Sequence, residues 1–268
     1  MGVKVDRFIA AFRPLRFRGK YRLLTPFAPK RGSLSARVFG YRMELDVSDW
    51  IQRNMYLGSY EQGETSRILG HLRPGMTFVD VGANVGYYTA MASSLVGAGR
   101  VISYEPNPYA FQRLNEWARA NHAINITPIC AALGSAEGTM SAYFTEADTR
   151  TTSLIPALAC HQGNKTIVNV RTLDNEAKRL GIRHIDVMKI DVEGYEPRVF
   201  KGASHLLEQG RIGAILCEFV SEWLSAGGSS TGELELVLKS RGFVRREMYG
   251  SEMAGDRWLV RSPASDVR

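Results

Sequence analysis

Residues 78–86 constrain the fold of this chain more than any other part of the sequence. A short apolar run, 77–81, contains Asp80 and is followed at once by Gly82-Ala-Asn-Val-Gly86. An apolar run of this length is typical of a parallel strand that is covered on both faces. Glycines after the strand allow a sharp turn and bring backbone close to a ligand, because they lack a Cβ atom. Ligands of open α/β sheets bind at the carboxyl ends of strands, so the sequence predicts a ligand-binding loop here.

Segments typical of strands and helices alternate along the rest of the chain. Besides 77–81, the predicted strands are 100–105, 124–130, 139–144, 166–171, 184–190, 212–219, 243–247 and 257–260, and the predicted helices are 87–96, 108–121, 173–180, 197–208 and 232–240. A polar insert at 145–165 interrupts the pattern, and a Gly/Ser loop is expected at 225–232. Such alternation is typical of a parallel sheet with helices on both faces. We therefore predict an α/β, Rossmann-like fold with a mostly parallel seven-stranded sheet and an antiparallel C-terminal edge strand.

The first 48 residues differ from the rest in charge and pattern. Of the 34 Lys and Arg and the 27 acids in the chain, residues 1–42 hold eleven bases and one acid, Asp6, which gives +10. The remainder has 23 bases and 26 acids, or −3. Residues 6–17 could form a short amphipathic helix, and 34–47 alternate like a hairpin. We therefore separate a basic extension, 1–48, from a main domain, 49–268, which begins with helices at 49–57 and 62–71.

The basic extension suggests a partner of opposite charge. It could contact an anionic lipid surface, an anionic glycan or nucleic acid, and a solvated arm that aids solubility fits the same residues equally well. No window approaches the roughly 18–20 apolar residues of a membrane span, and no apolar signal core precedes residue 20. The three cysteines, Cys130, Cys160 and Cys217, form no CxxC pair, and we expect Cys130 and Cys217 to be small core residues. We expect a cytoplasmic protein. If the extension binds lipid, the protein would lie at the inner face of the membrane.

Glu105 ends the next predicted strand, nineteen residues after Gly86. A carboxylate there can accept hydrogen bonds from both ribose hydroxyls of an adenosine-containing cofactor. The loop reads D-x-G-x-N-x-G, and Asp80 suits an ammonium group better than a pyrophosphate. The Walker A pattern is absent. The sequence thus favours S-adenosylmethionine over NAD(P), with a glycine turn that binds nothing as the other alternative.

A second cluster of acids follows the predicted strand 184–190. Asp191 and Glu193 come directly after this apolar run and should lie at the same sheet edge as the glycine loop. Two acids at the end of a buried strand are costly to desolvate unless a ligand or a reaction makes use of them. A surface turn is the alternative interpretation.

These motifs together resemble the FkbM family of methyltransferases. The matching segments are Gly58-Ser-Tyr-Glu61, Asp80-Val-Gly-Ala-Asn-Val-Gly86, Glu105-Pro-Asn107, Thr172-Leu-Asp174, Lys189-Ile-Asp-Val-Glu-Gly194 and Lys201-Gly-Ala203. The similarity covers roughly residues 45–220. It implies a class I methyltransferase fold, S-adenosylmethionine as methyl donor, and usually O-methylation of a natural-product or sugar hydroxyl.

The resemblance also implies the residues of the site. The cofactor-binding set is Glu61, Asp80, Gly82, Ala83, Asn84, Gly86, Glu105, Pro106, Asn107, Ala131, Ala132 and Asp191. Within it, the glycine loop would line the methionine part, Glu105 the ribose, and Ala131 and Ala132 the adenine. An alcohol acceptor must also lose a proton, which a nearby carboxylate can take. Glu193 is the first candidate, Asp191 would orient acceptor or cofactor, and Glu218, at the end of strand 212–219, is next.

Weaker features leave alternatives open. His161 could be a base or a bystander, and a metal linking Asp191 and Glu218 lacks a diagnostic spacing, so no metal ligands are predicted. Three aromatic residues could form a wall for a ring-shaped acceptor or simply pack helices: Trp50, Tyr56 and Tyr60. A small molecule or glycan is the expected substrate. A non-catalytic S-adenosylmethionine-binding scaffold and a nucleic-acid methyltransferase that uses the basic arm are the other hypotheses, although the Pro-Pro-Tyr motif of amino-methylation is missing.

Overall fold

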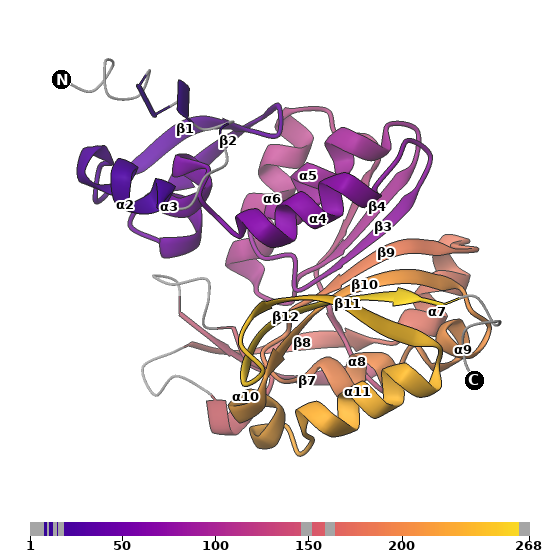
Figure 1. Ribbon diagram of the computed structural model, residues 1–268. Helices are drawn as coiled ribbons and strands as arrows, with labels where there is room; N and C mark the ends of the chain where they lie inside the picture. Colours follow the sequence, from indigo (N-terminus) through magenta and orange to yellow (C-terminus); the bar gives the residue numbers. More distant parts are fainter. Residues whose placement is uncertain are drawn as a thin grey trace.

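The computed structural model describes residues 8–9, 11–12, 15, 19–145, 152–158 and 164–262. A seven-stranded sheet crosses the middle of the molecule (Figure 1). Its strands are β3 (Thr77–Val81), β4 (Arg100–Tyr104), β5 (Ile126–Ile129), β9 (Ile185–Ile190), β10 (Ile212–Val220), β11 (Phe243–Gly250) and β12 (Ala254–Arg261). They lie in the order β11-β12-β10-β9-β3-β4-β5.

Five neighbouring strands of this sheet, from β10 to β5, are parallel. β12 pairs antiparallel with β10, and β11 pairs antiparallel with the outer side of β12. The predicted α/β architecture is confirmed. The strand that runs antiparallel to the others is β12, and it is second from the edge of the sheet because β11 is the edge strand. Trp258 and Leu259 on β12 are correspondingly buried.

Helices cover both faces of the sheet, as predicted. One face carries α4 (Gln62–His71), α5 (Tyr87–Val96) and α6 (Pro108–Ala120), and the other carries α7 (Leu173–Leu180), α8 (Glu196–Lys201), α9 (Ser204–Glu208) and α11 (Thr231–Ser240). Successive residues of a strand point to opposite faces, so Phe78 of β3 joins the first core and Val79 the second. The described part of the sheet is therefore enclosed between two apolar layers.

The prediction of a single helix over 197–208 is wrong. The chain forms α8 and α9 there, with a break at Gly202 and Ala203. Gly202 lies against the backbone of Gly134, where an added Cβ would come within 1.9 Å of the carbonyl oxygen. This close contact fixes the chain where it passes from one helix to the next. A short helix that was not predicted, α10 (Ser221–Ala226), occupies the start of the expected Gly/Ser loop region.

The N-terminal part packs onto the main domain. The predicted hairpin is confirmed as β1 (Ser33–Val38) and β2 (Tyr41–Asp46), preceded by α2 (Lys20–Leu24) and η1 (Thr25–Phe27) and followed by α3 (Trp50–Leu57). The Asp49 carboxylate begins α3 by accepting from the Gln52 amide at 2.8 Å. Val38 and Met43 share the hydrophobic core of α5 and α6. The predicted helix at 6–17 lies mostly outside the described residues. Across the described ranges, none of the helices is both long and apolar enough to span a bilayer.

A second sheet of three strands follows β5. It contains β6 (Ala132–Leu133), β8 (Asn164–Arg171) and β7 (Gly138–Phe144) in that order. Of the polar insert between β7 and β8, the structure describes residues 145, 152–158 and 164–165, including η3 (Pro156–Leu158). Ser153 forms an isolated antiparallel bridge with Tyr143 of β7 and so ties this segment to the three-stranded sheet. Cys217 is buried as predicted, but Cys130 is exposed because it lies after the end of β5.

Candidate active site

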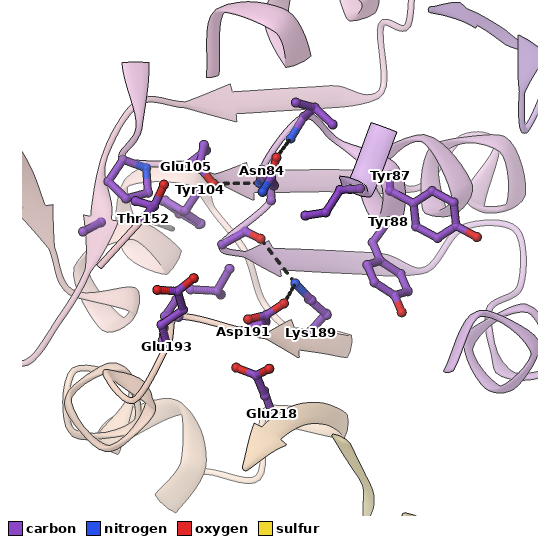
Figure 2. Close-up of a pocket in the computed structure, with 18 of the residues that line it drawn as sticks. Asn84, Tyr87, Tyr88, Tyr104, Glu105, Thr152, Lys189, Asp191, Glu193 and Glu218 are labelled. Carbon is purple, nitrogen blue, oxygen red and sulfur yellow. Dashed lines mark hydrogen bonds and ion pairs between the residues drawn. The ribbon is translucent and has the colours of Figure 1, made fainter. Parts of the chain in front are cut away.

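A cavity of about 220 Å³ opens at the carboxyl ends of β3, β4, β9 and β10 (Figure 2). Most of the predicted site residues line it: Glu61, Gly82, Ala83, Asn84, Glu105, Pro106, Ala131, Ala132, Asp191, Glu193 and Glu218. Sequence reasoning gave no role to several others: Ile51, Val81, Val85, Tyr87, Tyr88, Tyr104, Leu133, Thr152, Leu154, Lys189, Val192 and Trp223. The structure thus brings together segments that are more than a hundred residues apart in the chain.

The glycine loop is held tightly between β4 and the end of β9. The backbone amides of Gly82 and Ala83 both donate to the Tyr104 carbonyl oxygen at 3.0 Å. Gly82 has φ 77°, and a Cβ on it would lie 1.9 Å from the Asp191 carbonyl oxygen. Only glycine fits this position, both for its backbone conformation and for the close approach of the two strand ends.

Glu105 provides a buried acceptor beside the glycine loop. Its Oε2 accepts from the Asn84 amide at 2.7 Å, and its Oε1 accepts from the Asn107 amide at 2.8 Å. Burial raises the pKa of Glu105 to about 7, against the opposing effect of these two amides. Each carboxylate oxygen keeps a second lone pair for a further donor. The position therefore fits the predicted role of accepting two ribose hydroxyls.

Lys189 is a buried cation at the floor of the cavity, and it is only 5% exposed. Its Nζ lies 3.0 Å from Asp191 Oδ2 and 3.3 Å from the Gly82 carbonyl oxygen (Figure 2). Burial alone would lower the pKa of Lys189, but the carboxylates of Asp191, Asp80 and Glu61 outweigh burial and raise it. The signal in the sequence was a lysine beside Val187, Met188 and Ile190 in β9, and the family motif includes this lysine without assigning it a role.

Asp80 lies behind the cavity wall instead of lining it. Its side chain is fully buried, and one oxygen accepts from Thr89 Oγ1 at 2.6 Å. Its other oxygen, Oδ1, has no hydrogen-bond partner within the described ranges. Burial raises the pKa of Asp80, while Lys189, its register partner on β9, lowers it. Asp80 is therefore not part of the described cavity lining, and its role beside the methionine ammonium stays a prediction.

Two further predicted cofactor residues also lie outside the cavity lining. Gly86 precedes α5 and packs against Leu114 and Trp117 of α6. Asn107 is buried and caps α6, where its Oδ1 accepts from the Tyr109 amide at 3.0 Å. Its Nδ2 donates to Thr152 Oγ1 at 2.9 Å and so ties the insert to the site. These residues shape the cavity through the elements that they position.

The three predicted catalytic acids share one side of the cavity. Asp191 and Glu193 follow β9, and Glu218 belongs to β10. Figure 2 shows their carboxyl groups on the side opposite Glu105, with Glu218 directed toward Asp191. Burial, and next the negative charge of Asp191, raise the pKa of Glu218 well above its ordinary value. Glu193 has φ 51°, a left-handed conformation that is rare for residues other than glycine.

The N-terminal part supplies the remaining wall. The Glu61 carboxylate accepts a hydrogen bond from Tyr88 Oη. Burial raises the pKa of Glu61 to about 7, although Lys189 opposes this effect. Trp50 and Tyr60 line the cavity with ring centroids 6.1 Å apart, and a role for them as a wall for the acceptor stays a prediction. Tyr56, the third predicted member of that wall, is a core residue instead.

The other candidates add no site that the structure describes. His161 falls outside the described residues. Within the described ranges, no group of three or more His, Cys, Asp or Glu is arranged to hold a metal ion.

The glycine loop, Glu105 and the sheet topology define a class I S-adenosylmethionine-dependent methyltransferase. The methyltransferase FkbM domain matches residues 80–245, and the chain belongs to this family. The cofactor is therefore S-adenosylmethionine, and the residues around the cavity fit it, since Gly82 leaves room for close approach and Glu105 can accept two hydroxyls.

Two relatives and one solved structure illustrate the similarity. Hexuronic acid methyltransferase AglP from Haloferax volcanii is 27% identical over 187 residues, which are 66% of this chain and 71% of the relative. Methyltransferase sdnD from Sordaria araneosa is 25% identical over 194 residues, 62% and 72% of the two chains. Aeropyrum pernix fibrillarin with natively bound S-adenosyl-L-methionine has a TM-score of 0.46 and 14% identity, covering 88% of this chain and 85% of fibrillarin.

Proposed function

We propose that this methyltransferase methylates a hydroxyl group of a sugar, glycan or natural-product small molecule. One observation carries the proposal: Asp191, Glu193 and Glu218 converge on the cavity that also holds the glycine loop and Glu105. An alcohol is a poor nucleophile until its proton is removed, and carboxylates are suited to that task. The Haloferax volcanii relative is named for a sugar acid, which agrees with a hydroxyl-rich substrate class.

S-adenosylmethionine supplies an electrophilic methyl group when it is bound. Glu105 would accept its ribose hydroxyls, and the backbone of Gly82 to Asn84 would lie along its methionine part. Glu193 would take the proton of the acceptor hydroxyl on a carboxylate oxygen. Asp191, which Lys189 holds at 3.0 Å, would orient the acceptor. These residues would align the reactants. The surrounding aromatic side chains would exclude water and so prevent side reactions.

The experiment that tests this function separates cofactor binding from turnover. The full chain is incubated with isotopically labelled S-adenosylmethionine and a panel of sugars and secondary alcohols, and mass spectrometry detects methylated products. Calorimetry with S-adenosylhomocysteine measures cofactor binding independently. We expect Glu193→Gln to bind S-adenosylhomocysteine normally and to lose at least about 100-fold in turnover, the usual contribution of a general base.

Glu222→Gln is the matched control, because Glu222 is an exposed acid on α10 close in sequence to Glu218. This control should retain both binding and turnover. Full turnover in Glu193→Gln would remove Glu193 from the mechanism. Tight cofactor binding without methylation of any alcohol would support the non-catalytic scaffold instead.

A further inference from the structure

The N-terminal part of the molecule exposes a group of large apolar side chains. Phe8, Leu15, Leu23 and Phe27 are 39%, 50%, 47% and 50% exposed. The Phe8 ring lies against Phe12 and Phe27, with ring centroids 4.8 and 5.5 Å away, and the Leu15 amide donates to the Phe12 carbonyl oxygen at 3.1 Å. We call the four exposed side chains the apolar patch. Large apolar side chains that gather on a surface mark a site of contact with a partner or a membrane.

Bases accompany the apolar patch in the sequence, with no acid among them. Residues 7–43 contain ten Lys or Arg and no Asp or Glu. Arg22 adjoins Leu23 in α2, and Lys30 and Arg31 follow Phe27 by three and four residues. All three of these bases are exposed. The patch therefore combines apolar side chains with positive charge.

A second exposed apolar group, on α11, differs in charge. Leu236 and Val237 are exposed there, and the same helix carries Glu233 and Glu235. An anionic partner would meet like charge at α11 and opposite charge at the apolar patch. Of these two groups, the N-terminal one is therefore complementary to an anionic surface.

A buried lysine ties the patch to the helix that supplies part of the cavity wall. Lys20 of α2 is 1% exposed, and its Nζ donates to the carbonyl oxygens of Leu15 and Gly58 at 2.7 Å each. Gly58 ends α3, whose residues Trp50 and Ile51 line the cavity. Figure 1 shows α2 and α3 side by side in the indigo part of the chain. A surface that binds the patch would thus hold the element that carries this wall.

The composition of the patch favours a lipid bilayer over a nucleic acid. Nucleic-acid sites combine positive charge with open aromatic faces on which bases stack. Leu15 and Leu23 have no such faces, and Phe8 meets Phe27 edge to face. Leucine and phenylalanine beside lysine and arginine are instead typical of segments that lie in the interface of an anionic membrane.

We propose that the apolar patch and its exposed bases form a docking surface for an anionic phospholipid bilayer. The apolar side chains would enter the boundary between head groups and acyl chains, and Arg22, Lys30 and Arg31 would contact lipid phosphates. The strength of such binding depends on both the apolar area that is buried and the attraction between charges. The proposal concerns a surface outside the cavity and is independent of which hydroxyl is methylated.

Sedimentation with lipid vesicles tests the proposal on the full chain. Phosphatidylcholine vesicles with about 30% phosphatidylserine present the anionic surface, and pure phosphatidylcholine vesicles are the neutral comparison. We expect the anionic vesicles to bind the protein at least about tenfold more tightly at about 0.15 M salt. Leu23→Gln with Phe27→Gln should weaken that binding at least about tenfold, because two apolar side chains are lost from the interface. Arg22→Gln with Lys30→Gln and Arg31→Gln should weaken it about 100-fold.

Matched controls change the same types of residue elsewhere. Leu236→Gln with Val237→Gln removes two exposed apolar side chains from α11. Arg119→Gln with Lys178→Gln and Lys239→Gln removes three exposed positive charges outside the N-terminal part. Both controls should bind anionic vesicles as the wild type does. Calorimetry with S-adenosylhomocysteine should give the wild-type affinity for every variant, which shows that each one is folded.

The proposal is overturned by equal binding to neutral and anionic vesicles, by undiminished binding in either N-terminal variant, or by an equal loss in the controls. Filter binding to polyuridylate addresses nucleic acid as the competing partner. If loss of the three bases lowers polyuridylate binding while loss of Leu23 and Phe27 leaves vesicle binding intact, the surface belongs to nucleic acid instead.

Discussion

Lys189 Nζ lies 3.0 Å from Asp191 Oδ2, and this buried ion pair joins the chemistry of the cavity to the structure of the sheet. The same ammonium group contacts the Gly82 carbonyl oxygen at 3.3 Å. Across the β3–β9 pairing, Lys189 is also in register with Asp80. One lysine thus contacts the glycine loop, holds an acid that lines the cavity, and balances the charge of a carboxylate behind the cavity wall.

Replacing Lys189 by methionine should destabilise the protein strongly. The change leaves Asp80 and Asp191 without their shared cation, and breaking a buried ion pair costs about 3–5 kcal/mol. Urea denaturation at about pH 7 measures the free energy of unfolding. Lowering the pH should reduce the difference in free energy of unfolding between this variant and the wild type, because protonation removes the uncompensated negative charges of the two carboxylates. Lys178→Met, at an exposed position of α7, should change stability by less than about 0.5 kcal/mol. Equal effects of the two substitutions would show that Lys189 carries no structural charge balance.

Cofactor affinity should depend on the ionisation of Glu105. Burial raises its pKa from 4.5 to about 7, so the unliganded folded state holds this proton more tightly than the unfolded chain does. The stabilisation from Glu105 is therefore present below about pH 4.5 and is lost as the pH rises through about 7. Ribose hydroxyls donate hydrogen bonds to the ionised carboxylate. The affinity for the cofactor should therefore increase as the pH rises through about 7, while the contribution of Glu105 to folding stability decreases.

Calorimetry with S-adenosylhomocysteine between about pH 6 and pH 8 measures this dependence. Glu105→Gln should bind more weakly and show a flatter pH profile. Glu61 is the necessary comparison, since its pKa is also raised to about 7 by burial. A pH profile that flattens in Glu61→Gln and not in Glu105→Gln would assign the titration to Glu61.

Strand ends could be predicted from the sequence because their geometry is general. Parallel strands place their carboxyl ends at one edge of the sheet, so Glu105, Asp191 and Glu218 had to approach each other once the strands were recognised. Whether a side chain near a strand end reaches the cavity or stays buried behind it cannot be predicted from the neighbouring sequence. Asp80 therefore appeared to be a ligand-facing acid, although it accepts from Thr89 inside the core.

Contacts between distant segments explain the other differences. The break between α8 and α9 depends on the approach of Gly202 to Gly134, which is 68 residues earlier in the chain. The hydrogen bond from Tyr88 to Glu61 joins α5 to the residue that precedes α4. Neither contact can be predicted from the hydrophobic periodicity of the sequence, because each depends on how whole helices and strands pack against one another.

Gly82→Ala should reveal the close approach of β3 and β9. The backbone at Gly82 has φ 77°, and the new Cβ would lie 1.9 Å from the Asp191 carbonyl oxygen. Gly40→Ala is a matched control, since Gly40 has φ 92° and nothing within 4 Å of the added atom. The control should lose about 1 kcal/mol of stability, and Gly82→Ala more than about 3 kcal/mol, measured by urea denaturation. Similar losses at both positions would show that the strand ends can separate at little cost.

Asp174, in the family motif Thr172-Leu-Asp174, should be a structural residue. Its carboxylate accepts from the amides of His205 and Leu206 at 3.0 Å each, at the start of α9. The side chain thus joins α7 to α9, outside the cavity lining, and satisfies amides that the first turn of a helix leaves unpaired. Asp174→Ala should lower the free energy of unfolding by about 1–2 kcal/mol, as loss of a helix cap does. The affinity for S-adenosylhomocysteine, measured by calorimetry under conditions where the variant is folded, should be unchanged. Weaker binding with unaltered stability would instead place this motif in the cofactor site.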